Sequence, residues 1–227
     1  MKRTRIIIVT DSVSMPRAEI RYEDTWIYLL KKEFPHYDII DRPGRGSTTT
    51  RLVTEGGGGV DLLEMYLPDI VITQLGMADC APRLFNKRGL EYRIVSRTLP
   101  EWARRRYISW VKKHRVRDPE VTEVPPDEFR NNIIGFYRRA QAVGARVLVI
   151  PILPAMDLMV KKSPHVQNNV ERYNGIYREV AAQFPNVKIV DPFRDNGGID
   201  INSMAIDEVH VNSKGLKMIF ECLKPLL

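Results

Sequence analysis

The first apolar run of the chain lies within Arg5-Ile6-Ile7-Ile8-Val9-Thr10-Asp11-Ser12 and is typical of a strand that is buried on both faces. Its four consecutive β-branched residues favour an extended backbone, whereas a strand with one solvated face would alternate apolar and polar residues. Comparable runs recur along the chain. The sequence therefore predicts five strands, at residues 5–10, 37–41, 69–75, 145–153 and 187–190.

Segments with helical periodicity separate these strands. We predict helices at residues 24–34, from Pro125 onwards, at 166–184 and at 213–223, the last with Asn212 or Ser213 as its N-cap. Strands that alternate with helices indicate an α/β fold. The predicted fold is a three-layer α/β/α sandwich with a five-stranded parallel sheet, flavodoxin-like in class, and we expect residues 1–227 to form a single domain.

Composition excludes several classes of protein. The chain has 44% apolar and 28% charged residues, which is ordinary for a globular fold. Its longest apolar runs are far below the roughly 20 residues that cross a bilayer, and the N-terminal apolar run is too short for a signal peptide. Cys80 and Cys222 lie too far apart in sequence to suggest a disulfide framework. We therefore expect a cytoplasmic protein with no membrane partner; its oligomeric state is left open.

The net charge of +7 prompts the question of an acidic partner. The densest basic segment spans residues 99–117, where Trp102, Tyr107 and Trp110 share one helical face and most arginines lie opposite. We interpret this segment as a helix with a packed aromatic face and a solvated basic back, and we predict no nucleic-acid partner. Four consecutive glycines, residues 56–59, predict a flexible loop.

Polar residues that follow the predicted strands are candidates for chemistry, because ligands of open parallel sheets bind beyond the carboxyl ends of the strands. Ser12 follows the first strand, and His210 lies in a loop after the fifth. A serine hydroxyl needs a base to become a nucleophile, and a neutral imidazole suits that task. Asp207, three residues before His210, is placed to orient the imidazole ring.

Taken in order, the motifs at these strand ends resemble the four sequence blocks of the SGNH or GDSL hydrolase family. Thr10-Asp11-Ser12 is similar to the first block, Gly46 matches the glycine of the second, Gly76-Met77-Ala78-Asp79 resembles the third, and Asp207 with His210 matches the last. Ala78 stands where the family carries an asparagine. The resemblance implies the three-layer α/β/α fold and a serine esterase in which Ser12 is the nucleophile, His210 the base and Asp207 the orienting acid.

The same resemblance implies that the backbone N–H groups of Ser12 and Gly46 form the oxyanion hole, with Gln74 or Arg83 as possible replacements for the missing asparagine. We expect contacts to the substrate from Asp11, Arg45, Gly76, Asp79 and Arg83. Arg17, Arg42, Arg45, Arg83 and Lys87 lie in or near these loops and favour an anionic or strongly hydrogen-bonding substrate over a long lipid chain. The resemblance, in turn, implies a carbohydrate or other small polar ester with a short acyl group such as acetyl. No cofactor and no metal are implied.

Three alternatives remain. Gly44-Arg45-Gly46 could cradle a phosphate, although the third glycine of a dinucleotide fingerprint is Thr49 here. Asp11, Asp79, Asp207 and His210 could hold a metal ion in a metal-dependent hydrolase. The strongest alternative, prompted by Ala78, is a catalytically weak or inactive domain of the same fold that binds a glycan or a protein partner.

Overall fold

The computed structural model describes residues 3–17, 19–54, 59–194 and 199–227. Its centre is one parallel sheet with the strand order β2-β1-β3-β4-β5, which is the order of flavodoxin-like folds. The strands are β1 (Arg5–Thr10), β2 (Asp38–Pro43), β3 (Ile70–Gln74), β4 (Arg146–Val149) and β5 (Val187–Ile189). The predicted five-stranded parallel sheet is thereby confirmed.

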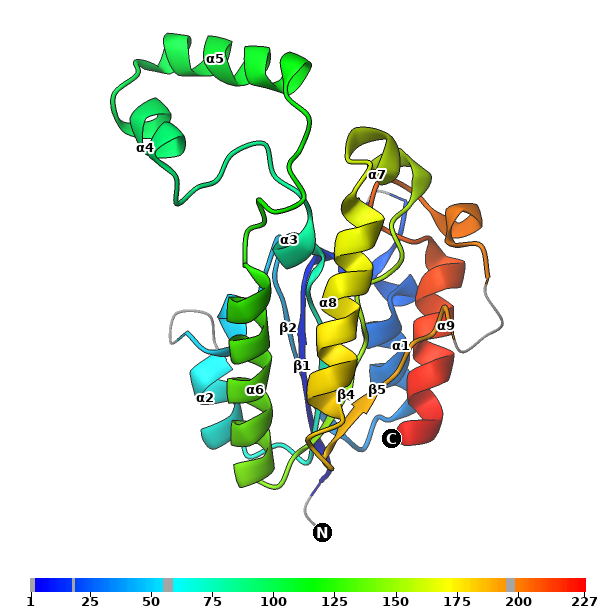
Figure 1. The fold of residues 1–227 in the computed structure, drawn as a ribbon. Coiled ribbons are helices and arrows are strands. Elements are labelled where there is room, and N and C mark those ends of the chain that lie inside the picture. The colour runs from blue at the N-terminus through cyan, green and yellow to red at the C-terminus, as the bar shows by residue number, and fades with distance from the viewer. Residues whose placement is uncertain (1–2, 18, 55–58, 195–198) are drawn as a thin grey trace.

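Helices cover both faces of this sheet (Figure 1). One layer contains α2 (Gly59–Glu64), α6 (Pro126–Ala142) and α8 (Val166–Ala181), and the other contains α1 (Trp26–Glu33) and α9 (Ser213–Leu223). Alternate residues of β1 enter the two cores: Ile7 and Val9 face α6 and α8, whereas Ile6 and Ile8 face α1 and α9. The isoleucines that predict a strand buried on both faces therefore contribute side chains to the apolar cores on both faces of the sheet.

Further helices lie toward the carboxyl ends of the strands. They are α3 (Met77–Cys80), α4 (Leu90–Arg97), α5 (Glu101–His114) and α7 (Asp157–Lys162), with short 3-10 turns η1 (Ser12–Ser14), η2 (Tyr22–Asp24), η3 (Thr49–Leu52) and η5 (Ile201–Met204). A last 3-10 turn, η6 (Lys224–Leu226), follows α9 at the C-terminus. Among the residues with described coordinates, no helix is both long and apolar enough to cross a bilayer. The predicted glycine loop falls outside the described residues except for Gly59, which begins α2.

Two predictions need correction. The fourth strand ends at Val149 rather than at residue 153, because Pro151 and Pro154 have no N–H to donate to a neighbouring strand. The aromatic face of the basic helix is also not packed as predicted. Trp102 is 72% exposed and Trp110 is 54% exposed on α5, while Val111 is fully buried.

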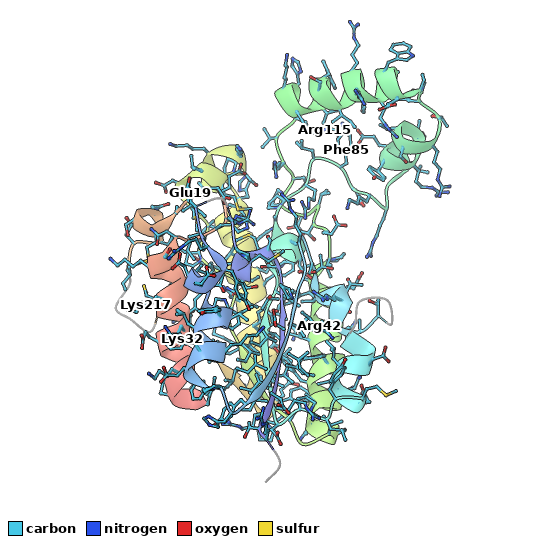
Figure 2. All side chains as sticks on the ribbon, turned by 180° about the vertical axis from the view of Figure 1, so that it is seen from behind. Glu19, Lys32, Arg42, Phe85, Arg115 and Lys217 are labelled. Atoms are coloured by element: carbon cyan, nitrogen blue, oxygen red, sulfur yellow. The ribbon has the colours of Figure 1, made fainter. Side chains whose placement is uncertain are left out.

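The reason is the position of α4 and α5, which stand clear of the sheet and its covering helices (Figure 1). In Figure 2, Arg115 and Phe85 lie together at the base of this excursion, with the guanidinium carbon 5.5 Å from the ring centre. Periodicity identified an apolar face, but that face is covered in part only, by α4 and by Phe85 of the preceding loop.

Candidate active site

A short turn that follows β1 places Ser12 just beyond the edge of the sheet. Asp11 caps η1, because its Oδ1 accepts a hydrogen bond from the backbone N–H of Val13 at 2.8 Å. The N–H of Asp11 bonds the carbonyl of Gln74 at 3.0 Å, which ties the end of β1 to the end of β3. Ser12, the first residue of η1, is thus presented at the carboxyl edge of the sheet, where ligands of this fold class bind.

His210 is presented by a second turn, directly before α9. The carboxylate of Asp207 accepts hydrogen bonds from the backbone N–H groups of Val209 (2.9 Å) and His210 (3.0 Å), a turn that aspartate side chains commonly stabilise. Asn212 then caps α9, with its Oδ1 accepting from the N–H groups of Lys214 and Gly215. The last predicted helix and its cap are confirmed.

The two turns bring Ser12 and His210 into hydrogen-bond contact across 198 residues of sequence. Ser12 Oγ lies 3.1 Å from His210 Nε2, and His210 Nδ1 lies 2.7 and 2.8 Å from the two carboxylate oxygens of Asp207. Since Nδ1 faces only carboxylate oxygens, we assign its proton there, which leaves Nε2 as the acceptor for the serine hydroxyl. The three residues predicted to act together are in one hydrogen-bonded chain.

Burial and nearby positive charges favour the neutral form of the His210 imidazole. Burial lowers the pKa of His210 below its ordinary value, and the positive charges of Arg17 and Arg45 lower it further, against the opposing effect of Asp207. Burial acts to raise the pKa of Asp207, but hydrogen bonds from the Val209 N–H and from His210 outweigh it, so the pKa stays below its usual range. A neutral imidazole beside an ionised carboxylate is the state that accepts a proton from a hydroxyl group.

Gly46 lies in the turn after β2. It has φ +66°, a conformation that disfavours most side chains, and the turn is closed by the Ser47 N–H on the carbonyl of Gly44 at 3.1 Å. The N–H of Gly44 bonds the carbonyl of Thr10 at 2.9 Å, so this turn is fixed beside the end of β1. Within the described residues, neither the Ser12 N–H nor the Gly46 N–H donates to a protein acceptor.

Two residues predicted to contact substrate have structural contacts of their own. Asp79 is fully buried, and its Oδ1 accepts from the N–H of Thr49 (2.8 Å) and from the Thr49 hydroxyl (2.5 Å), which ties α3 to η3. Gly76 has φ +124°, and a Cβ there would lie 2.5 Å from Ile152 Cγ1. Gly76 therefore allows close packing against the core, and the substrate contacts expected of Gly76 and Asp79 stay predictions.

Arg83 and Gln74 also make contacts within the protein. Arg83 donates to the carbonyl of Ala78 at 2.7 Å and lies 3.8 Å from Glu123, so it fixes the base of the α4–α5 excursion. Gln74 is 3% exposed, and its Oε1 accepts from the indole N–H of Trp26 at 3.2 Å. Both side chains are held in the structure, but Gln74 Nε2 and Arg83 Nε are buried without a hydrogen-bond partner among the described residues, and the roles expected of these two residues stay predictions.

Asp11 is similarly buried, at 5% exposure, and burial raises its pKa to about 7. Its carboxyl group borders a cavity of about 10 Å³ that is also lined by Gln74 and Leu75, room for about one water molecule. Asp11 therefore supports the turn that carries Ser12 rather than facing the solvent. Its contact with substrate stays a prediction.

The space in front of the nucleophile is small and positively charged. A pocket of about 210 Å³ is lined by Ser12, Met15, Pro16, Arg17 and Arg45. Arg45 thus lies where the sequence predicts a substrate contact. A larger cavity of about 480 Å³ beside α8 includes neither Ser12 nor His210 in its lining, so we do not assign it to the reacting group.

Arg17 is the residue that sequence reasoning did not assign to the site. Its Nη2 contacts Nε2 of His210 and lies 3.4 Å from the carbonyl of Ser12. The sequence marks it only as one of several arginines near the predicted loops. Its contact with a residue 193 positions away has no local signal.

The side chains that the sequence suggests as metal ligands lie in separate parts of the structure. In the described part of the chain, no three His, Cys, Asp or Glu residues are grouped to hold a metal ion. The Asp79 carboxylate lies on Thr49, whereas Asp207 faces His210.

The sequence also matches a known protein family. Residues 10–218 match the GDSL-like lipase/acylhydrolase family. The chain belongs to this family. It is a hydrolase that acts on ester bonds, and the resemblance read from the four sequence blocks is confirmed.

Solved structures share the fold of this GDSL-family hydrolase. TesA has a TM-score of 0.59 and 22% identity, and the match covers 99% of this chain and 100% of that one. A lipase/acylhydrolase from Enterococcus faecalis has a TM-score of 0.62 and 15% identity, covering 98% and 94%. An acetyl xylan esterase, AlAXEase, has a TM-score of 0.61 and 15% identity, covering 98% and 99%. No curated protein sequence matches the chain.

Proposed function

We propose that this hydrolase removes a short acyl group, such as acetyl, from a carbohydrate or another small polar ester by a Ser-His-Asp mechanism. The observation that carries the proposal is the hydrogen-bonded chain from Ser12 Oγ through His210 to Asp207, at 3.1 and 2.7 Å. This arrangement of a nucleophile, a base and an orienting carboxylate recurs among serine hydrolases of unrelated folds.

In the proposed reaction, Ser12 Oγ forms a bond to the ester carbonyl carbon while its proton passes to Nε2 of His210. The tetrahedral intermediate then collapses, the bond to the alcohol oxygen breaks, and the imidazolium gives its proton to that leaving oxygen. Water attacks the acyl-serine with the same imidazole as base, which releases the carboxylic acid. Asp207 stabilises the imidazolium that forms in each half of the reaction.

The N–H groups of Ser12 and Gly46 are the proposed donors to the oxyanion. Both belong to turns fixed at the same edge of the sheet, and neither donates to an acceptor within the described protein residues. Preorganised N–H groups at this position lower the barrier because they require no reorientation as negative charge develops on the oxygen.

Two observations support a short acyl group and a polar substrate. The pocket at Ser12 has a volume of about 210 Å³, below the roughly 300 Å³ at which pockets for drug-sized ligands begin. Two of its five lining residues are arginines. One structural relative is an acetyl xylan esterase, which acts on an ester of this kind.

The test is hydrolysis of p-nitrophenyl esters from acetate to octanoate, with a serine-reactive fluorophosphonate probe alongside. We expect cleavage to be greatest with the shortest acyl chains, and expect Ser12→Ala and His210→Ala to lose at least about 1,000-fold in kcat with little change in Tm. Ser109→Ala, which removes an exposed hydroxyl group on α5, serves as the matched control. Full activity in Ser12→Ala would refute the assignment.

The alternative function, binding without turnover, is favoured by one feature, Ala78 at the position of the family's asparagine. A folded wild-type protein that binds acetylated sugars, cleaves no ester and leaves the probe unreacted would support that alternative.

A further inference from the structure

Two guanidinium groups in the pocket at Ser12, those of Arg17 and Arg45, make no ion pair with a carboxylate of the described residues, although the charge of Arg17 acts on Asp11 at longer range. Some arginines elsewhere pair with acids, as Arg130 does with Glu179 at 2.7 Å and Arg139 with Glu64 at 2.7 Å, whereas others, such as Arg42, are exposed to solvent without an acidic partner among the described residues. In the part of the chain that the structure describes, no ion pair involves Arg17 or Arg45, and both line the pocket beside the nucleophile. Surface arginines are commonly solvated, but these two converge on the reacting groups.

The environment of Arg17 is the more unusual. Its Nε is buried and has no hydrogen-bond partner among the described residues, while its Nη2 contacts Nε2 of His210. A buried N–H group without an acceptor is unfavourable, and more so when the group is charged. An anion in this pocket would supply the acceptor that the protein does not.

The contact with His210 has a mechanistic consequence. A neutral imidazole offers a single lone pair at Nε2, and both the Ser12 hydroxyl and the Arg17 guanidinium are directed at it. While Arg17 donates to this nitrogen, the base is less available to accept the proton of Ser12. The same side chain therefore both occupies the base and extends into the substrate pocket.

We infer that the natural ester carries an anionic group, a carboxylate or a phosphate, close to the scissile bond. Arg17 and Arg45 bind this anion, and the interaction draws Arg17 away from His210, which leaves the lone pair to Ser12. This inference rests on the proposed serine esterase function and adds to it a substrate class: acylated acids rather than neutral acylated sugars. Arginine suits the role because its planar guanidinium group binds carboxylate and phosphate oxygens in pairs.

The experiment compares acetate esters that differ in charge: 4-acetoxybenzoate, 4-acetoxyphenyl phosphate and the neutral methyl 4-acetoxybenzoate. Each kcat/KM is corrected for the ester's own rate of alkaline hydrolysis. We expect the wild type to prefer at least one anionic ester to the neutral one by about tenfold or more, which is the range of a charge-assisted hydrogen bond. The two anionic esters distinguish a carboxylate site from a phosphate site.

Arg45→Gln should abolish this preference. Arg17→Gln should abolish it and, because the base is released, raise kcat/KM for the neutral ester. Arg42→Gln is the matched control, since Arg42 is exposed and its guanidinium lies 3.3 Å from the carbonyl of Asp41 and 3.5 Å from the hydroxyl of Tyr66. It removes the same charge near the site and should keep the wild-type preference.

The outcomes separate the two proposals. Ser12-dependent cleavage with no preference for an anion, or a preference that Arg42→Gln also removes, overturns the anion site and leaves the esterase intact. A fall or no change in kcat/KM for the neutral ester in Arg17→Gln overturns the inference that Arg17 competes with Ser12 for the lone pair of His210. If no ester is cleaved, titration of 4-hydroxybenzoate and inorganic phosphate into Ser12→Ala by calorimetry still tests the site: absence of binding overturns it, and binding lost in Arg17→Gln supports it.

Discussion

Asp207 uses one carboxylate for two tasks. Its Oδ1 receives the backbone N–H groups of Val209 and His210, which shape the turn, and the same group faces Nδ1 of His210. Because the turn and the ring orientation share a carboxylate, the position of the imidazole is fixed by bonds made within four residues. This is the part of the site that short-range sequence spacing was able to predict.

The pH dependence of catalysis follows from the neutral form of His210. The lowered pKa of this imidazole means that it remains deprotonated to more acidic pH than an ordinary histidine. We expect kcat/KM to fall as the pH decreases through a value below 6.5, because the protonated ring has no lone pair for the serine proton. A profile of kcat/KM from pH 4 to 8 checks this. A midpoint above 6.5 would contradict it.

Ala78 offers a second prediction for a single residue. If this position faces the oxyanion, Ala78→Asn adds a side-chain donor, and one such donor changes turnover by about 100- to 1,000-fold in other hydrolases. We expect kcat to rise by at least about tenfold. Ala78→Leu, of similar size but without a donor, is the control and should give no gain. A folded Ala78→Asn variant with unchanged kcat would indicate that another group already fills this role.

Among the elements, the α4–α5 excursion concentrates the charge of the protein. Residues 87–117 contain eleven lysines and arginines and two glutamates, a net charge of +9, which leaves −2 for the rest of the chain. The inner faces of the two helices are held by local contacts, such as the Tyr107 hydroxyl on Glu91 at 2.8 Å. The positive charge that the composition reports is therefore a property of this excursion rather than of the sheet and its covering helices.

The packing of α5 predicts different effects for its apolar residues. Trp102→Ser should change the stability of the helix by less than about 0.5 kcal/mol, because the indole is 72% exposed. Val111→Ala should cost about 1–3 kcal/mol, since the side chain is fully buried and leaves a cavity. Amide hydrogen exchange across residues 101–114 measures the opening of this helix separately from global unfolding. Equal effects of the two substitutions would contradict the observed orientation of α5.

For the molecule as a whole, two buried acids couple folding to pH. Burial raises the pKa of Asp11 to about 7 and that of Asp79 to about 6, both well above the value of 3.8 for an exposed aspartate. The folded state therefore holds these protons more tightly than the unfolded state. The resulting stabilisation is complete below about pH 4 and is lost as the pH rises through 6 and 7.

We expect the contribution of Asp11 to make the wild type less stable at pH 8 than at pH 5 by an amount on the order of a few kcal/mol. Asp11→Asn should reduce this difference, because the amide does not ionise. Urea unfolding at the two pH values measures it, with Asp61→Asn, an exposed position on α2, as the control. An Asp11→Asn variant with the same pH dependence as wild type would show that Asp11 is ionised in the folded state.

The sequence by itself determined the features that depend on neighbours along the chain. The isoleucines of β1 specify a strand buried on both faces, and Asn212 caps a helix whose bounds, Ser213–Leu223, were predicted from capping and periodicity. Ser12, Asp207 and His210 were found because serine chemistry suits those residue types at strand ends and because the four motifs, taken in order, resemble the blocks of the SGNH or GDSL family. Each of these inferences uses interactions within a few residues or a motif of fixed spacing.

Only the tertiary structure decided which polar groups are buried and which side chains meet across the sheet edge. Asp79 follows a strand as Ser12 does, yet Thr49, 30 residues away, encloses it. Trp102 lies on an apolar helical face that no other layer covers, and Arg17 contacts His210 across 193 residues. Periodicity and spacing describe one element at a time, whereas burial and charge contacts depend on what packs against that element, and the packing is set by the whole chain.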